Sequence, residues 1–463
     1  MSEEFTMKLP NIIMMTDSYK LSHHEQYPEG TTILESYVEA RGGADKSVFF
    51  GQQAWLKDYM GGQVLEQWMI DEARPRIQAH GFTFNEDWQE ILDTHEGRIP
   101  VRIFSVAEGT YMETQNAQTI ISNTDPRFPW LVSHIETMML RAIWYPSTVA
   151  TLSKSIRDII YDALDETADD PDAEIDFKLH DFGARGTTCH EQAKLGGMAH
   201  LVNFKGTDTL EGITGAEEYY GPVEAFSIPA SEHSTMTAWG REGELAAYTN
   251  LLDKYPTGLV ACVSDSYDIW NAVDNLWGVE LRDRVMERDG TLVVRPDSGD
   301  PVETPVKVIE RLMKAFGYYT NTKGYKVLPE QVRVLQGDGI GINEVKQIIE
   351  LMKKKRLSLS NIAFGMGGGL LQAPMRDDLQ YAQKASAALI NEVWVDVFKD
   401  PISGGKTSKK GRLMLIKEEG VYKTLKVESP ARHLQREMNC VFNDGYIMKT
   451  YTMQEVIANA KKD

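Results

Sequence analysis

The sequence has only three cysteines among its 463 residues, and Cys189, Cys262 and Cys440 lie far apart. An odd number of widely spaced cysteines supports neither a disulfide framework nor a CxxC metal site, so we expect a reducing compartment. The N-terminus also lacks the basic and apolar regions of a signal peptide, and no apolar stretch is long enough to cross a bilayer. These absences predict a cytoplasmic protein with no membrane partner.

Positive charge is also scarce. The sequence contains 49 Lys and Arg residues and 68 Asp and Glu residues, which gives a formal net charge of -19. Nucleic-acid binding needs a basic surface that displaces counterions, so we expect no nucleic-acid partner. A local basic pocket for an anionic substrate remains compatible with this balance, and residues 406–412 form one basic run. A chain of this length with 42% hydrophobic and 25% charged residues predicts a globular protein of more than one domain.

A repeated pattern occupies residues 175–370: an apolar run, a polar or glycine-rich segment, then a helix-like stretch. Seven such units spaced for one strand and one helix each predict a central, irregular, parallel α/β barrel of about seven strands. In such barrels the polar segments at the carboxyl ends of the strands form the active-site mouth, so we expect an enzyme. The apolar runs are 177–179, 199–202, 224–226, 258–263, 291–294, 332–335 and 361–363.

The segments on either side of this pattern predict a different structure. Residues 31–40 and 99–113 alternate as antiparallel strands do, and residues 52–62 and 66–80 favour helices. After prolines that include Pro146, residues 148–168 predict a long amphipathic helix, and residues 411–427 predict a β-hairpin. We therefore expect a mixed α+β domain over 1–147, completed by 391–463, and a barrel domain over 148–390.

The polar segments supply an inventory of chemical groups. The carboxylates are Asp181, Asp208, Glu232, Asp265, Asp297 and Asp338, and the cations are Arg185, Lys205, Arg295 and Arg376. The glycines of 336–339 and 364–369 allow backbone amides to approach a phosphate. One imidazole, His233, follows Glu232. This inventory fits a phosphorylated sugar bound by glycine loops and arginines, with Mg²⁺ nearby.

Several blocks of the sequence, in order from about residue 11 to the C-terminus, resemble the nicotinamide phosphoribosyltransferases. The resemblance implies a type II phosphoribosyltransferase fold and the condensation of nicotinamide with phosphoribosyl pyrophosphate, giving nicotinamide mononucleotide and pyrophosphate. It also implies Mg²⁺ as cofactor, ATP as co-substrate through a phosphorylated histidine, and a homodimer with shared active sites. The blocks are TDSYKLSHHEQYPEGT, HDFGARG, HLVNFKGTDTL, SIPASEHSTMTAWG, VSDSYDIWNA, RPDSGDP, QGDGI, NIAFGMGGGLLQ and FKDP with SKKGR.

The resemblance also implies roles for individual residues. His233 is the expected phosphorylated histidine, with Asp265 or Asp297 orienting its ring. The implied nicotinamide ligands are Phe182, Tyr19 of the partner subunit and Asp208, and Arg185 is expected to reach the amide oxygen or the ribosyl phosphate. The implied phosphoribosyl ligands are Arg295, Gly337, Asp338, Gly367 and Gly368, and the implied pyrophosphate or ATP ligands are Arg41, Arg376, Lys384 and Lys406. The identity of the Mg²⁺ ligands is left open.

Asp208 bears on the choice between nicotinamide and nicotinate. A carboxylate repels the nicotinate anion and accepts a hydrogen bond from a carboxamide, so Asp208 favours nicotinamide. The alternatives are a nicotinate phosphoribosyltransferase of the same fold and a non-catalytic relative that binds nucleotides. The chain departs from the family pattern at Ser231 and at three positions beside the expected pocket and loops, Ala184, Ala261 and Met366.

Overall fold

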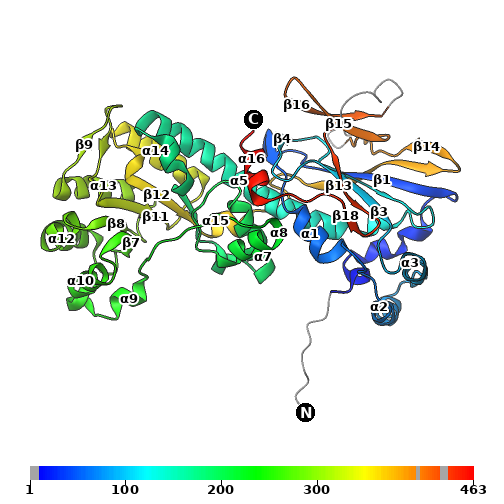
Figure 1. The fold of residues 1–463 in the computed structure, drawn as a ribbon, viewed down its shortest axis with the longest axis horizontal. Coiled ribbons are helices and arrows are strands. Elements are labelled where there is room, and N and C mark those ends of the chain that lie inside the picture. Colours follow the sequence, from blue (N-terminus) through cyan, green and yellow to red (C-terminus); the bar gives the residue numbers. More distant parts are fainter. Residues whose placement is uncertain (1–9, 403–406, 428–435, 463) are drawn as a thin grey trace, which may run out of the picture. The chain divides into compact units, whose positions relative to one another are not determined.

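A computed structural model describes residues 10–402, 407–427 and 436–462. The chain forms two units, one of Met1–Thr148, Glu218–Pro222 and Met375–Asp463, the other of Val149–Glu217 and Val223–Pro374 (Figure 1). Within the described ranges, no helix has both the length and the apolar character that crossing a bilayer requires. All three cysteines are free.

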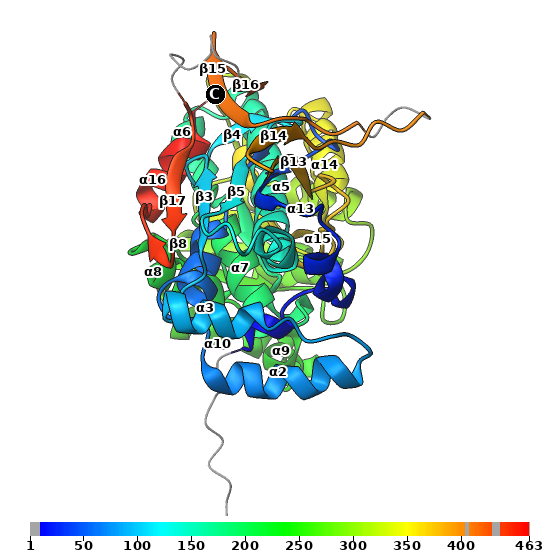
Figure 2. The same ribbon diagram turned by 90° about the vertical axis from the view of Figure 1, so that its right-hand side faces the viewer.

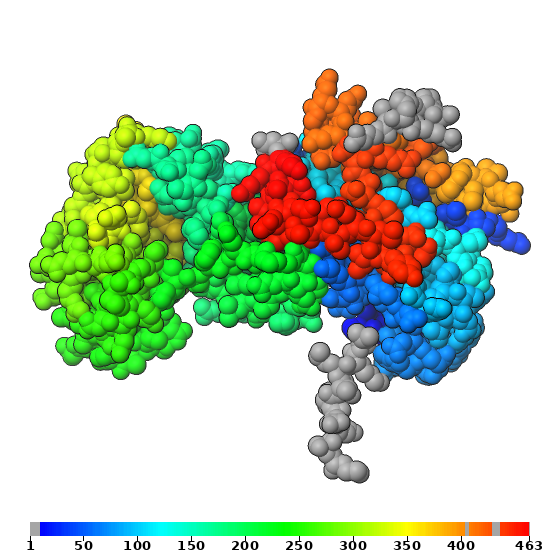
Figure 3. Space-filling model, in the orientation of Figure 1, coloured from blue at the N-terminus to red at the C-terminus, as the bar shows by residue number. Residues whose placement is uncertain are grey.

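The first unit is built on a seven-stranded antiparallel sheet that joins the two ends of the chain. Figure 2 shows C-terminal β17 beside β3, and Figure 3 shows that N-terminal (blue) and C-terminal (orange and red) residues share this unit. The strands, in sheet order, are β14 (Val393–Asp396), β13 (Ala382–Ile390), β1 (Thr31–Glu39), β5 (Thr119–Asn123), β3 (Val101–Ser105), β17 (Asn439–Asn443) and β18 (Tyr446–Ile447). Residues 382–390, predicted to lie with the barrel, therefore belong here, because β13 pairs with β1.

The two faces of this sheet carry different side chains. Leu34 and Val38 of β1, with Ile103 and Ile121, belong to a large apolar core. Helices α2 (Gln67–Ala79), α3 (Asp87–His95) and α4 (Leu131–His134) contribute to the same core. The opposite face forms a small cluster with Leu413 of β15 (Leu413–Glu418), which pairs with β16 (Val421–Lys426). The predicted hairpin over 411–427 is confirmed.

The remaining elements of the first unit are short, apart from the first part of one long helix that continues beyond Thr148 into the second unit. Helix α5 (Glu136–Thr167) begins before Pro146, so the predicted start at residue 148 is wrong. The buried residues Ile143, Tyr145, Ser147 and Val149 keep the helix continuous through this proline. The others are η1 (Ile12–Met14), η2 (Ser18–Glu25), β2 (Lys46–Val48), α1 (Gln52–Trp55), η3 (Leu56–Met60), β4 (Tyr111–Glu113) and α16 (Met453–Ala460).

The second unit contains a parallel five-stranded sheet in the order β6, β12, β11, β8, β7. The predicted strands near 179, 258–263, 291–294, 332–335 and 361–363 are confirmed. They correspond to β6 (Leu179–Asp181), β7 (Thr257–Val263), β8 (Asp289–Arg295), β11 (Val332–Gln336) and β12 (Ile362–Met366). The mixed α/β fold class predicted from the repeated pattern is therefore correct.

Two of the seven predicted strands are wrong. Residues 199–202 end helix α7 (His190–His200) and begin the following turn, because Met198 and Ala199 continue its buried face. Residues 224–226 form no strand either. Single parallel bridges join Asp181 to Thr207, Gly206 to Phe226 and Ala230 to Ala261, so residues 206–207 and 226–230 link β6 to β7 and complete the ring of backbone pairing.

Helices surround the barrel strands. The long ones are α10 (Glu244–Lys254), α13 (Glu303–Phe316) and α14 (Ile342–Lys354), each with a buried apolar side. The others are α6 (Pro171–Glu174), η4 (Ile175–Phe177), η5 (Ala184–Gly186), α8 (Leu210–Tyr220), α9 (His233–Thr237), η6 (Arg241–Gly243), α11 (Ile269–Asn271), η7 (Ala272–Glu280), α12 (Arg282–Met286), η8 (Leu359–Asn361) and α15 (Gly368–Leu371). A small ribbon of β9 (Tyr319–Thr320) and β10 (Lys326–Val327) completes the unit.

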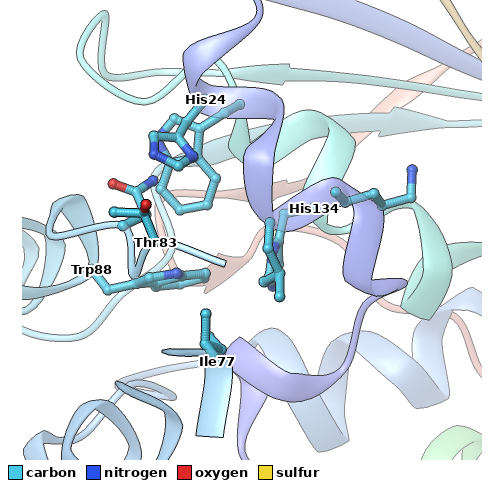
Figure 4. A pocket seen from close by; sticks show the side chains of 9 residues that line it. His24, Ile77, Thr83, Trp88 and His134 are labelled. Carbon is cyan, nitrogen blue, oxygen red and sulfur yellow. The ribbon is translucent and has the colours of Figure 1, made fainter. Parts of the chain in front are cut away.

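His134 lies at a small cavity of about 10 Å³ in the first unit, a volume that suits one water molecule. Figure 4 shows the side chains of His24, Ile77, Thr83, Trp88 and His134 around it. The His134 ring packs against the Trp88 edge at 4.9 Å between centroids, and its Nε2 lies 3.3 Å from the carbonyl oxygen of Ile12. Burial lowers the pKa of His134 to about 4.

This buried histidine predicts a loss of stability in mild acid. Below pH 6.5 the unfolded chain binds a proton at residue 134, whereas folded His134 resists protonation until about pH 4. The stabilisation is therefore complete above pH 6.5 and falls towards pH 4, by about 2 kcal/mol at pH 5. Urea unfolding of wild type and His134→Gln at pH 7.5 and 5 should show a smaller pH dependence in the variant. Exposed His80 provides the control, because His80→Gln should keep the wild-type dependence; equal dependence in all three proteins would contradict the assignment.

Candidate active site

The carboxyl ends of the barrel strands carry most of the expected site residues. Arg295 is the last residue of β8, Gly337 follows β11, and Gly367 follows β12. Phe182 follows β6, and its amide donates to the carbonyl oxygen of Met366 at 2.9 Å. Because the strands are parallel, these residues meet at one end of the barrel.

The ring of Phe182 occupies space left by two glycines. The apolar residues Ala261, Val293 and Leu335 fill the barrel interior, and Phe182 packs against them. A Cβ atom at Gly365 would lie 2.0 Å from Phe182 Cε2, and one at Gly337 would lie 3.0 Å from the same atom. Any side chain at residue 365 would therefore displace the ring.

Arg295 connects this ring to the carboxylates. Its guanidinium carbon lies 5.6 Å from the Phe182 ring centroid, within the range of a cation–π contact. Its Nε donates to Asp297 Oδ1 at 3.0 Å, and a terminal nitrogen donates to the same oxygen. Asp297 thus holds the guanidinium beside the aromatic ring.

His233 lies between two carboxylates. Its Nε2 is 3.0 Å from Asp265 Oδ1, and its Nδ1 is 3.8 Å from Asp297 Oδ2. Ser298 donates a hydrogen bond to the other oxygen of Asp265. Because Asp265 is an acceptor, the neutral ring carries its proton on Nε2 and leaves a lone pair on Nδ1. His233 is 45% exposed, so a ligand can reach it.

Asp208 lies in the segment that pairs with β6. Its amide donates to the carbonyl oxygen of Asp181 at 2.9 Å, and Ser227 Oγ donates to Asp208 Oδ1 at 2.5 Å. Asp208 is exposed, whereas Asp181 is fully buried. Burial raises the pKa of Asp181 to about 6, and the charge of Asp208 adds to this effect. Asp208 is thus the acceptor of this pair that a substrate can reach.

The other expected barrel residues are also at strand ends. Arg185, in η5, is exposed, as are Asp338 and Gly368. Gln336 Nε2 donates to the carbonyl oxygen of Asp338 at 2.8 Å, which fixes that glycine-rich turn. A Cβ atom at Gly367 would lie 3.3 Å from the carbonyl oxygen of Phe182. Gly367 therefore lies close to Phe182, whereas Arg185 and Asp338 are exposed to solvent.

The other expected ligands belong to the first unit. Lys384 on β13 pairs with Tyr37 on β1, and Arg41 follows the end of β1 with its Nε 3.8 Å from Glu39 Oε1. Tyr19 is 59% exposed. Arg376 is exposed and forms an ion pair with Asp377 at 3.2 Å. Lys406 lies outside the described residues.

The structure adds residues that sequence reasoning missed. Lys409 forms an ion pair with Glu39, the same carboxylate that Arg41 approaches. Gly365 and Ser298 contact Phe182 and Asp265 directly. Their signals were present in the SKKGR, FGMGGG and RPDSGD segments, but only the folded chain shows which residue of each segment makes contact.

The carboxylates of the described residues do not form a metal cage. Among the residues that the structure describes, no group of three or more His, Cys, Asp or Glu side chains is placed to hold a metal ion. Mg²⁺ at phosphate-transfer sites commonly takes one or two carboxylates and completes its shell with water and substrate oxygens. Asp265 and Asp297, which flank His233, fit that limited role.

Two family models match the chain. The nicotinate phosphoribosyltransferase (NAPRTase) family matches residues 177–445, and the nicotinamide phosphoribosyltransferase N-terminal domain matches residues 11–103. A nicotinamide phosphoribosyltransferase from Xanthomonas campestris is 45% identical over 463 residues, covering 98% of each chain. Another from Mycoplasma pneumoniae is 32% identical and covers 84% of this chain and 92% of its own.

Solved structures show the same fold. Nicotinate-nucleotide pyrophosphorylase from Pyrococcus furiosus superimposes with a TM-score of 0.61 at 16% identity, over 99% of this chain and 97% of its own. Human nicotinic acid phosphoribosyltransferase gives 0.57 at 14% identity, over 96% and 93%. With the sequence matches, these likenesses establish that the chain belongs to the nicotinate phosphoribosyltransferase family and carries the nicotinamide phosphoribosyltransferase N-terminal domain.

Proposed function

We propose that the protein transfers the phosphoribosyl group of phosphoribosyl pyrophosphate to nicotinamide, giving nicotinamide mononucleotide and pyrophosphate in NAD salvage. It is thus a pentosyltransferase. The observation that carries this function is the 45% identity over 98% of the chain to a nicotinamide phosphoribosyltransferase. The arrangement of Phe182, Arg295 and Asp208 supports it.

Phe182 provides the surface for the pyridine ring. Aromatic rings stack with an offset, and Phe182 is held by the glycines beneath it. Arg295 lies over the same ring and presents its guanidinium to the phosphoribosyl group. The pyridine nitrogen is already a nucleophile, so the reaction needs positioning more than a general base.

Breaking the bond between ribose C1 and pyrophosphate is the difficult step. We assign the stabilisation of the leaving pyrophosphate to cationic side chains, namely Arg41, Arg376, Lys384 and Lys406. Mg²⁺ bound to the pyrophosphate would neutralise further charge when present, with Asp265 and Asp297 available as protein ligands. Arg295 remains tied to Asp297 and keeps its orientation.

Asp208 selects the carboxamide. Its side chain is exposed to the site and oriented by Ser227. A carboxamide NH₂ donates to this carboxylate, whereas a nicotinate carboxylate is repelled by it. The nicotinate-specific alternative would require a cation at this position.

A product assay tests the substrate and the role of Asp208 together. With phosphoribosyl pyrophosphate and Mg²⁺, wild type should form nicotinamide mononucleotide from nicotinamide and little product from nicotinate. Asp208→Asn should lose about tenfold or more of this selectivity in kcat/KM, because it removes the repelling charge. Exposed Asp283→Asn is the control and should behave as wild type. A preference of wild type for nicotinate would refute the assignment. If wild type forms no product from either base, a binding protein is favoured.

We also propose that ATP hydrolysis is coupled to the reaction through His233. Asp265 fixes the proton on Nε2, so Nδ1 would attack the γ-phosphorus of ATP and release ADP. The new N–P bond would later be cleaved by water to give phosphate and restore the imidazole. Asp297, held by Arg295, lies on the Nδ1 side and would orient the ring.

The coupling predicts a specific kinetic defect. His233→Ala should remove the stimulation of product formation by ATP and abolish ATP hydrolysis, while turnover without ATP persists, because the proposed role of His233 is confined to the phosphate of ATP. Asp265→Asn should weaken the stimulation, and exposed His190→Ala should retain it. Measurement of ADP release beside nicotinamide mononucleotide provides the readout. Undiminished ATP stimulation in His233→Ala would exclude the phosphohistidine.

We further propose a homodimer in which Tyr19 of one subunit closes the pyridine site of its partner. Tyr19 is 59% exposed, which is a large exposure for an aromatic side chain. Its ring is fixed by an edge contact to His23 at 5.2 Å and by Lys20, whose Nζ lies 5.3 Å from the ring centroid. A partner subunit would cover this surface.

Subunit mixing tests the shared site. Tyr19→Ala and Arg295→Ala should each be nearly inactive, yet their mixture should regain activity, because a mixed dimer keeps one site without either substitution. Sedimentation should show a dimer at micromolar concentration for all three proteins. A monomeric wild type, or a mixture without recovered activity, would contradict the shared site.

A further inference from the structure

A polar row crosses the face of the seven-stranded sheet that the β15–β16 hairpin covers. Glu35 on β1 lies opposite Ser122 on β5, and Ser122 lies opposite Arg102 on β3. Paired residues of antiparallel strands point to the same face, so the three side chains share one side of the sheet. With strands about 4.8 Å apart, Glu35 and Arg102 are separated by roughly 10 Å, with Ser122 between them.

The next row along the strands is apolar. Ile120 lies opposite Phe104, and Ile120 forms a buried cluster with Tyr37 and Leu413 against which Phe104 and Met438 pack. This cluster closes one side of the polar row. The hairpin therefore covers the sheet by apolar contact at one end and leaves the polar row facing a cavity.

The cavity above the polar row has a volume of about 120 Å³, which is larger than the volume that a few water molecules occupy. Arg412 and Arg436 join Arg102 in its lining, and Glu35 is the one carboxylate among the lining residues that the structure describes. Three guanidinium groups against one carboxylate leave a formal charge of +2 in a chain whose net charge is -19.

Arg102 and Arg412 each have defined neighbours, and Glu35 is the carboxylate that pairs with one of them. Arg102 Nε donates to Asn443 Oδ1 at 2.7 Å, which uses one of its five N–H donors. Arg412 lies over the Trp394 ring with 4.6 Å to the centroid, and its Nε is 4.0 Å from Glu35 Oε2. Glu35 itself accepts from the amide of Leu413 at 3.2 Å.

We propose that this cavity is a second anion-binding site, which takes a phosphate dianion, either free or as a phosphate monoester, between Arg102, Arg412 and Arg436 and above Ser122. A phosphate group carries about 1.5 to 2 negative charges at neutral pH, which is close to the +2 of the cavity. Its oxygens accept from arginine forks and from a serine hydroxyl. The site lies wholly in the first unit, apart from the barrel strands, and does not rest on the proposed function.

Glu35 lowers the positive charge of the cavity and thereby limits the negative charge of the ligand. Burial raises the pKa of this carboxyl, and the charges of Arg412 and Arg436 act in the opposite direction. A trianion or longer polyphosphate would exceed the charge of the cavity, and a neutral sugar would leave the guanidinium groups unpaired. The chemistry therefore selects a single phosphate group.

Phosphate binding to the full-length protein tests the site. Isothermal titration of wild type and Arg102→Gln/Arg412→Gln with inorganic phosphate and with ribose 5-phosphate should show one binding event per chain that the double variant loses, or weakens by about tenfold or more, while binding at the barrel stays the same in both proteins. Loss for both probes identifies a site for monoesters, and loss for inorganic phosphate alone identifies a free-anion site. Binding that is the same in both proteins, in stoichiometry and affinity, would overturn the proposal.

Two controls separate the site from folding and from the barrel. Ser122→Val removes the central hydroxyl without changing charge and should also weaken phosphate binding, whereas Arg76→Gln on the exposed face of α2 should not. Nicotinamide mononucleotide formation without added phosphate should be unchanged in all these variants. If Ser122→Val and Arg76→Gln bind phosphate equally well, the cavity is only a structural ion-pair cluster.

Discussion

An aromatic ring in the mouth of a barrel needs space, and here the absence of two side chains provides it. Gly337 and Gly365 stand where parallel strands would otherwise carry inward-facing side chains, and Phe182 occupies the room that they leave. Small and branched residues below, among them Ala261 and Val293, support the ring from the barrel interior. Arg295 lies over this ring, so the ring sets the position of the guanidinium group that would bind the phosphoribosyl group.

From that ring, a chain of charges leads outward. Arg295 joins Asp297, Asp297 faces one nitrogen of His233, and Asp265 holds the other. Each member fixes the orientation of the next, so the imidazole presents one defined lone pair. In the proposed mechanism this arrangement separates the two chemistries, because the pyridine reacts beside Phe182 while phosphate from ATP is handled at His233.

The first unit shows how antiparallel register can build a second charged surface. One face of its sheet is an ordinary apolar core, whereas the other alternates an apolar row with the row of Glu35, Ser122 and Arg102. The hairpin from the C-terminal part of the chain seals the apolar row and brings Arg412 over the polar one. Both ends of the chain are therefore needed to form the cavity.

The sequence by itself determined the fold class, the five barrel strands, the C-terminal hairpin and the set of polar residues at the strand ends, because hydrophobic period and glycine placement are local signals. It did not separate residues 199–202 from a strand, since a short apolar run fits a helix end equally well, and it placed the start of α5 at residue 148, after Pro146, instead of at Glu136. Only the tertiary structure decided that Gly365 makes room for Phe182, that Asp265 binds Nε2 of His233, and that Arg102 and Arg412 share one cavity. These contacts join residues far apart in sequence, and their geometry follows from strand register and packing.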